Sequence, residues 1–252
     1  MASPFIFHLS SSLAANRYMN LYWSGDQNTS WGHNDGIKSA VTVMGHMGLS
    51  GYAHGHVEIG GYTTTWDSNG VVNRSAELLG RWRELSPVSS VVFRSHEGNV
   101  PHVNAQFYTN SSTYAYYAYN ARMFRSLAAY QRRILDTECK NLGWSLVRMP
   151  VIYHPDDVGA KATRHESFLL GSDLYVPAVL DPGCKCVEVY FLGQNQSYTH
   201  VWSGWRYKGG QKARVVVPYG KPAVFVVVQP KHNDLRGLLE FVRKENTAMI
   251  YV

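Results

Sequence analysis

Cysteine is scarce in this sequence, and the few cysteines present do not predict a set of disulfides. The three cysteines are Cys139, Cys184 and Cys186, an odd number that does not pair into a set of disulfides. Cys184 and Cys186 are separated by one residue, whereas zinc-binding and thioredoxin-type pairs have two. We therefore interpret them as a feature of a strand and not as a redox or metal site.

Long apolar runs are also missing. No stretch reaches the roughly 18 residues that a membrane-spanning helix needs, so we expect no membrane span. The first sixteen residues lack the basic start and the long apolar core of a secretory signal. N-x-[ST] sequons would permit glycosylation in a secretory compartment, so the localisation stays open; they lie at Asn28, Asn73, Asn110 and Asn195.

Clustered basic charge is absent although the net charge is +6. No basic run is longer than the pair Arg132-Arg133, whereas a nucleic-acid surface concentrates Lys and Arg on one face or helix. We therefore expect no nucleic-acid partner.

Aromatic residues, by contrast, are plentiful at 13 % of the chain, and apolar residues reach 45 %. That apolar content is enough for a sizeable core. The aromatic excess suits a sugar-binding protein, because flat rings stack on the apolar face of a pyranose. The alternative for each ring is ordinary core packing.

The first half of the sequence predicts β/α units. Short apolar runs typical of buried parallel strands alternate with apolar residues at helical spacing. The expected strands are 19–25, 52–58 and 88–93, and the expected helices are 34–49 and 75–85, with a loop over 60–65. This order favours a parallel sheet.

Polar side chains follow each of the three expected strands. Asp26 comes after the first, Glu58 after the second, and Arg94 and His96 after the third. In (β/α) barrels the active site lies at the carboxyl ends of the strands. We therefore expect these side chains to meet at one edge of the sheet.

The second half of the sequence has a different residue pattern. A helical pattern over 112–142 is closed by Gly143, and 145–230 carries short β-branched and aromatic runs separated by turn signals. These runs predict an antiparallel β-domain, followed by a short helix over 233–245. The fold class is therefore α/β plus all-β, with the boundary near 143–145.

Three motifs occur in a fixed order: WSGDQN at 23–28, EIGGYTT at 58–64 and RSHEGN at 94–99. Together they resemble the ends of the sixth, seventh and eighth barrel strands of glycoside hydrolase family 31, which comprises retaining α-glycosidases. The set is most similar to the sulfoquinovosidase-like branch. Later segments such as FLLGSDLYVPAVLDPG at 168–183 resemble the family's proximal C-terminal β-domain.

The resemblance implies a domain plan. Residues 1–16 would be an irregular N-terminus and 17–143 the C-terminal part of a (β/α)₈ TIM barrel, holding strands 6 to 8. Residues 144–252 would be an antiparallel β-sandwich with a terminal helix.

By resemblance Asp26 is the catalytic acid and base. A retaining glycosidase needs one carboxyl group that protonates the leaving oxygen and then activates water. Such an acid requires burial or a neighbouring carboxylate, which favours its protonated form, and the rings of Trp23 and Trp31 could provide that burial. The alternative is that Asp26 caps the following turn.

The other implied site residues bind substrate. His96 would hydrogen-bond sugar hydroxyls, Arg94 would anchor carboxylates, and Trp23 would line the site; the alternative for Arg94 and His96 is an ordinary surface pair. Tyr62 matches the tyrosine that helps to bind the sulfonate in sulfoquinovosidases. Glu58 departs from the family, which usually has Asp there, and its extra methylene would shift a contact by about 1 Å.

No metal or cofactor is expected. His46, His54 and His56 are close in sequence, but no cysteine or carboxylate has matching spacing, and the family needs no metal. The nucleophilic aspartate of the family lies on the fourth barrel strand, upstream of any motif found here. We therefore expect a fragment of an α-glycoside hydrolase whose partners are a carbohydrate substrate and the missing N-terminal half of the barrel. The alternative is an inactive sugar-binding or interaction protein derived from the same family.

Overall fold

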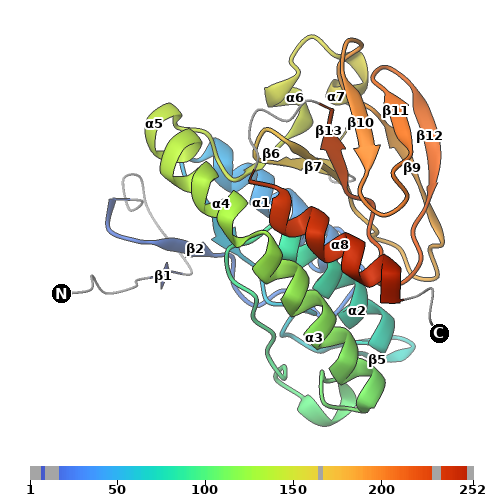
Figure 1. The fold of residues 1–252 in the computed structure, drawn as a ribbon. Helices are drawn as coiled ribbons and strands as arrows, with labels where there is room; N and C mark the ends of the chain where they lie inside the picture. Colours follow the sequence, from blue (N-terminus) through green and yellow to red (C-terminus); the bar gives the residue numbers. More distant parts are fainter. Residues whose placement is uncertain (1–6, 9–16, 164–166, 229–233, 249–252) are drawn as a thin grey trace.

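The computed structural model describes residues 7–8, 17–163, 167–228 and 234–248. Figure 1 shows a group of long helices beside a small parallel sheet, with a β-sheet domain packed against the helices. No helix in the described part is both long and apolar enough to cross a membrane. These features agree with the expected combination of a part-barrel and an antiparallel β-domain.

The parallel sheet is short. It has the order β1 (Phe7–His8), β2 (Leu21–Trp23) and β3 (Gly55–His56). Tyr22 pairs with Gly55 and Trp23 with His56, so β2 and β3 end side by side. β1 falls inside the segment that was expected to be irregular, most of which lies outside the described residues.

Four helices of this half lie where the sequence predicted helix. They are α1 (Ile37–Leu49), α2 (Ala76–Leu85), α3 (Ser111–Ser126) and α4 (Ala128–Ile134), and a π-helical turn (Leu135–Cys139) and α5 (Lys140–Leu142) continue the last of them. The hydroxyl of Ser75 accepts a hydrogen bond from the Leu78 N–H at 3.1 Å and caps α2 as predicted. Gly143 ends the helical run at φ 73°, a conformation that glycine adopts without strain.

The third expected strand, 88–93, is wrong. The chain forms a 3₁₀ turn at Ser86–Val88, and its only ladder contact in the described part is one parallel bridge between Ile59 and Ser95. The hydroxyl of Ser90 donates to the Gly55 carbonyl at 3.0 Å and accepts the Val92 N–H at 3.1 Å. Because side-chain hydroxyls take these backbone partners, a regular ladder does not form.

The segment expected to be a loop, 60–65, leads into a hairpin that was not predicted. From its last residue the chain enters a hairpin of β4 (Thr65–Asp67) and β5 (Gly70–Val72). This hairpin begins directly after the EIGGYTT motif, and the hydroxyl of Thr29 bonds the Val72 carbonyl at 3.1 Å.

The β-domain is antiparallel throughout the described residues. Its six-stranded sheet has the order β11-β10-β13-β8-β7-β6, and β9 and β12 form a separate pair. The strands are β6 (Val147–Arg148), β7 (Ser167–Leu170), β8 (Leu174–Pro177), β9 (Cys186–Tyr190), β10 (Ser197–His200), β11 (Arg206–Lys208), β12 (Lys212–Val216) and β13 (Phe225–Val227). Two short helices, α6 (Pro150–Tyr153) and α7 (Val158–Ala162), precede β7, and α8 (Arg236–Ala248) follows the domain.

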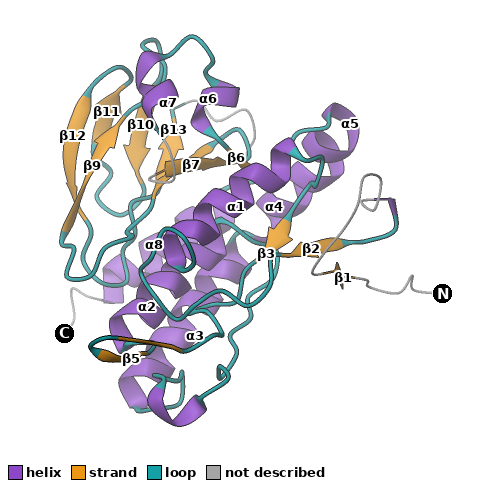
Figure 2. Ribbon diagram, turned by 180° about the vertical axis from the view of Figure 1, so that it is seen from behind, coloured by secondary structure: helices purple, strands orange, loops and turns teal. Residues whose placement is uncertain are grey.

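The six-stranded sheet is the middle layer of the molecule, as Figure 2 shows from behind. Phe168, Leu170 and Val176 pack with the helices in one core, whereas Leu169 and Tyr175 face the β9-β12 pair in a second core. This alternation follows the two-residue period of a strand. The larger core therefore crosses the division expected near residue 143, and that domain boundary stays a prediction.

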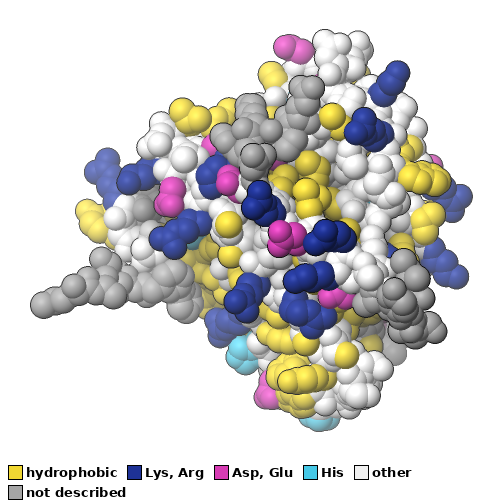
Figure 3. Space-filling view, viewed as in Figure 1, with side chains coloured by type: hydrophobic (Ala, Val, Ile, Leu, Met, Phe, Trp, Pro, Cys, Tyr) yellow, Lys and Arg dark blue, Asp and Glu magenta, His cyan; other side chains and the backbone are white. Residues whose placement is uncertain are grey.

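The terminal helix packs on the helical layer. Phe241 of α8 lies 5.3 Å from the Tyr119 ring of α3, measured between ring centroids. On the same face Lys and Arg side chains alternate with Asp and Glu (Figure 3). Arg122 pairs with Glu245 at 3.3 Å and Arg133 with Asp234 at 2.7 Å, so this face carries mixed charge.

Candidate active site

The three motif-bearing segments are joined by backbone hydrogen bonds where the strands end. The Ser24 N–H donates to the His56 carbonyl at 3.1 Å, and the Ile59 N–H donates to the Arg94 carbonyl at 3.0 Å. These bonds extend the β2–β3 alignment to the third segment. The side chains that follow each segment therefore share one edge of the sheet.

The Asp26 loop is held against the EIGGYTT loop. The N–H groups of Tyr62 and Thr63 both donate to the Gln27 carbonyl, at 2.7 and 3.0 Å. In addition, the Thr63 hydroxyl donates to the Asp26 carbonyl at 3.1 Å. The backbone at Asp26 and the backbone at Tyr62 are thus fixed side by side.

The burial expected around Asp26 is not found. Its side chain is exposed, and its carboxylate makes no hydrogen bond or ion pair within the described residues. Trp23 is half-buried, and Trp31 packs against the larger core and not over the carboxylate. Nor does Asp26 cap the turn, because the Asn28 N–H donates to Asp35 Oδ1 at 3.1 Å.

Glu58 is the buried carboxylate of the cluster. Only 1 % of its side chain is exposed, and its Oε1 lies 3.2 Å from Nη1 of Arg94, which is 46 % exposed. The Nε2 of buried His56 lies 3.7 Å from the other carboxylate oxygen. Arg94 therefore pairs with a carboxylate, and Glu58 is the residue at which the sequence departs from the family that it resembles.

His96 and Tyr62 lie edge to face. Their ring centroids are 4.8 Å apart with an interplanar angle of 77°. The Gly98 N–H points at His96 Nδ1 at 3.2 Å, so Nδ1 accepts and the proton of the neutral ring is on Nε2. Because His96 is exposed, this Nε2–H is free to donate to a hydroxyl group in front of the sheet edge.

Arg74 holds the cluster together, and the sequence did not reveal it. Its five N–H donors meet five acceptors: the carbonyls of Gly61, His96, Glu97 and Ala105 and the side chain of Gln106, at 2.9–3.3 Å. Burial lowers the pKa of Arg74 to about 10. One signal was available, since an arginine just before a helix is unfavourable at the positive end of the helix dipole and points to a buried role.

No metal centre is formed by the described residues. No group of three or more His, Cys, Asp or Glu side chains there could hold a metal ion. All three cysteines are free, and the Cys184 thiol lies 2.8 Å from the Cys186 carbonyl.

Two family models match the chain. The TIM-barrel domain of family 31 glycosyl hydrolases matches residues 1–129, and the C-terminal domain of the same family matches residues 143–229.

Individual relatives agree with these matches. The sulfoquinovosidase of Escherichia coli strain K12 is 32 % identical over 219 residues, which are 87 % of this chain and 31 % of that protein. The α-glucosidase of Hordeum vulgare is 27 % identical over 75 % of this chain and 20 % of its own length. The chain thus spans about a third of the length of the sulfoquinovosidase it matches.

Among solved structures, a GH31 sulfoquinovosidase from E. rectale in complex with an aza-sugar inhibitor superposes with a TM-score of 0.84. It is 27 % identical, and the match covers 96 % of this chain and 34 % of that one. A GH31 α-xylosidase from a soil metagenome, complexed with xylose, has a TM-score of 0.70 at 22 % identity over 88 % of this chain and 34 % of its own, and shows the shared fold.

Proposed function

This chain belongs to glycosyl hydrolase family 31, and from that premise we propose that it forms the acid/base side of a retaining α-glycosidase of the sulfoquinovosidase-like branch. The reaction is hydrolysis of the O-glycosyl bond of an α-glycoside. One observation carries the proposal: the Asp26 loop, the Glu58–Arg94 pair and the Tyr62–His96 pair are fixed at one sheet edge.

In this proposal Asp26 moves the proton. Its carboxyl group protonates the leaving oxygen as the glycosidic bond breaks, and its carboxylate then takes a proton from the water that releases the sugar. Its exposure leaves it open to a substrate in front of the sheet edge.

The nucleophilic carboxylate is proposed to lie outside these residues. A retaining enzyme needs a second carboxyl group about 5–5.5 Å from the acid. The matched relatives are about three times longer than the aligned segment, which leaves room for that residue. We propose that the chain is the C-terminal part of such an enzyme, about a third of its length, and works with the missing part of the barrel.

The neighbouring side chains are proposed to hold the sugar. His96 Nε2–H donates to a hydroxyl group, Tyr62 contributes its phenol beside it, and Trp23 lines the site. Arg94 keeps Glu58 in place, so that the longer carboxylate occupies the position of the family's usual aspartate.

A second candidate is a sugar-binding or interaction protein without catalysis. Two observations favour it: Glu58 replaces the family's usual Asp, and Asp26 lacks the burial that a catalytic acid needs within the described residues.

Hydrolysis of nitrophenyl α-glycosides distinguishes the two, measured for this chain and for a polypeptide in which the N-terminal part of a family 31 relative is joined to it. We expect activity in the joined polypeptide, and a loss of about 10²–10⁴-fold in kcat/KM with Asp26→Asn, because general acid–base catalysis contributes that much. Asp156→Asn, an exposed aspartate of the β-domain, is the control and should leave the rate unchanged. Equal rates for Asp26→Asn and the unsubstituted protein would reject Asp26 as the acid. Saturable sugar binding without turnover would support the second candidate.

A further inference from the structure

Two of the three cysteines lie close together at the start of β9. Cys184 and Cys186 are both partly exposed free thiols, and the Cys184 thiol donates to the Cys186 carbonyl at 2.8 Å. This hydrogen bond places the sulfur of one residue against the backbone of the other. The two thiol side chains are therefore neighbours in the folded chain.

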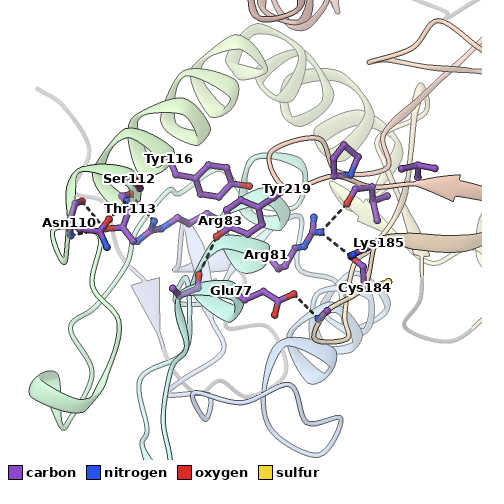
Figure 4. Close-up of a pocket in the computed structure, with 15 residues that line it drawn as sticks. Glu77, Arg81, Arg83, Asn110, Ser112, Thr113, Tyr116, Cys184, Lys185 and Tyr219 are labelled. Atoms are coloured by element: carbon purple, nitrogen blue, oxygen red, sulfur yellow. Dashed lines mark hydrogen bonds between the residues drawn. The ribbon is translucent and has the colours of Figure 1, made fainter. Parts of the chain in front are cut away.

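The backbone that carries the two thiols is held from two sides. Arg81 of α2 donates to the Cys184 carbonyl at 3.1 Å, and the Val217 N–H donates to the Lys185 carbonyl at 2.9 Å (Figure 4). Cys184 also borders a cavity of about 770 Å³ between α2 and the β-domain, which lets small molecules approach it. A reaction between the sulfurs thus needs rotation of the side chains and little movement of the backbone.

Arg214 of β12 lies beside the Cys186 sulfur. Its Nε donates to Cys186 Sγ at 2.8 Å, although 28 residues separate the two in the sequence. Arg214 faces Glu188 across the β9–β12 ladder, but its Nε–H points at the sulfur and not at that carboxylate. The hydrogen bond to Cys186 raises the pKa of Arg214. An arginine beside a partly exposed cysteine favours the thiolate, which is the form that reacts with oxidants.

The third cysteine lies in a different environment. Cys139 ends the π-helical turn and packs against the larger core, and burial raises the pKa of its thiol to about 11. A thiol of raised pKa has little of the reactive thiolate at neutral pH. Cys139 therefore provides a reference within the same chain for the reactivity of Cys186.

We propose that Cys184 and Cys186 are a thiol pair that a hydroperoxide oxidises reversibly to a disulfide. The Cys186 thiolate attacks one oxygen of hydrogen peroxide, so that an S–O bond forms, the O–O bond breaks and hydroxide leaves, which takes up a proton to become water. The sulfur is oxidised by two electrons to a sulfenic acid, and the peroxide is reduced. The Cys184 thiol then attacks this sulfur, the S–S bond forms, and the hydroxyl group leaves as water with the thiol proton.

The disulfide closes a small ring in which Lys185 is the only intervening residue. Strain makes a disulfide easier to reduce, so a thiol reductant should restore both cysteines. The spacing of the cysteines did not indicate this chemistry, because the arginine that supports it comes from another strand.

The test uses the purified chain without any sugar, so its outcome is separate from that of the proposed hydrolase function. The reduced chain is treated with a small excess of hydrogen peroxide, denatured and alkylated with N-ethylmaleimide, and mass spectrometry counts the alkylated thiols. We expect the count to fall from three to one, with Cys139 as the thiol that remains. Dithiothreitol should restore the count to three.

Cys184→Ser should stop the reaction at the sulfenic acid of Cys186, which dimedone traps, because no second thiol is left to displace the hydroxyl group. Arg214→Gln should slow the loss of thiols about tenfold, because it removes the cation that favours the thiolate. Arg206→Gln, an exposed arginine on β11, is the matched control and should react as the unsubstituted chain does.

The proposal is overturned if Cys139 is oxidised as fast as Cys186, or if Arg214→Gln and Arg206→Gln react at the same rate. It is also overturned if Cys186 passes to the sulfinic acid without forming a disulfide. A disulfide between two chains, seen as a dimer on a non-reducing gel, would reject the pairing of Cys186 with Cys184 of the same chain.

Discussion

Arg74 is the side chain on which the shape of the candidate site most depends. Its five donors join the EIGGYTT loop to the backbone of His96 and Glu97, and all five are satisfied. Because Arg74 is 1 % exposed, water cannot replace those bonds when the guanidinium is removed. The buried Gly61 carbonyl and the buried side-chain oxygen of Gln106 would then lose this donor.

Arg74→Met should therefore lower the free energy of unfolding by about 3 kcal/mol or more, since each unsatisfied buried group costs about 1–3 kcal/mol. Urea titration of the chain measures this. Arg74→Lys should recover little, because lysine has three donors and not a planar fork of five. Arg132→Met is the control, since that side chain is 84 % exposed and should change stability by less than about 0.5 kcal/mol. An unchanged urea midpoint in Arg74→Met would contradict the account.

For single residues, the sequence predicted which site residues come together better than it predicted how deeply they are buried. Glu58 pairs with Arg94 and Tyr62 with His96, because residues that follow aligned strands share one edge. The burial expected for Asp26 fails, since cover for a loop residue comes from segments distant in the chain. Arg74 was missed because four of its five partners are backbone carbonyls, which have no signature in a sequence.

In the helix α2, packing against Tyr219 outweighs the intrinsic helix preference for alanine over glycine. Gly80 lies inside this helix, where alanine would be favoured by about 1 kcal/mol. A Cβ atom there would come within 1.4 Å of the Tyr219 hydroxyl and 2.1 Å of the ring. Tyr219 cannot move without cost, because it stacks on Tyr116 and donates to the Ala76 carbonyl at 3.2 Å.

Gly80→Ala should therefore destabilise the chain by about 1–3 kcal/mol, the usual range for overpacking. In a Tyr219→Ala background the clash is gone, so the same change should stabilise by about 0.5–1 kcal/mol. Urea titration of the four proteins gives both values. If Gly80→Ala changes the free energy of unfolding in the same direction in both backgrounds, the Tyr219 ring is not the reason for glycine at position 80.

Helices were easier to predict than strands because the signals for a helix lie within its own residues. α1, α2 and α3 carry their periodicity in their own residues, and Ser75 caps α2 as expected. The apolar run 88–93 reads as a strand, but the hydroxyl of Ser90 takes backbone partners that a ladder would use. The β4–β5 hairpin has only three residues in each strand, too few for a periodic signal.

For the whole molecule, the decisive feature is the core that the two halves share. Residues of α1, α2 and α3 and residues of β7, β8 and α8 belong to one buried cluster. Breaking either half exposes apolar surface of the other. We therefore expect one cooperative unfolding transition for the described body, in which a change in either half alters the same midpoint.

Two histidines, the half-buried His54 in one half and the buried His200 in the other, give that transition a pH dependence. Burial lowers the pKa of both His54 and His200 to about 4, and for His200 the nearby Lys221 adds to the effect. In the unfolded chain each would titrate near 6.5. Between pH 6.5 and about 4 the unfolded state thus binds protons that the folded state does not.

Stability should therefore be full above pH 6.5 and fall as the pH drops toward 4, with His200 contributing about 3 kcal/mol of that loss at about 1.4 kcal/mol per unit. Thermal or urea unfolding at a series of pH values measures the slope. His200→Asn cannot be protonated, so its slope should be smaller by one proton between pH 6 and 4.5. His33→Gln, an exposed histidine, should keep the slope of the unsubstituted chain. If His200→Asn and His33→Gln have the same slope, His200 takes up its proton as readily in the folded state as in the unfolded one, and its burial does not govern the acid stability of the molecule.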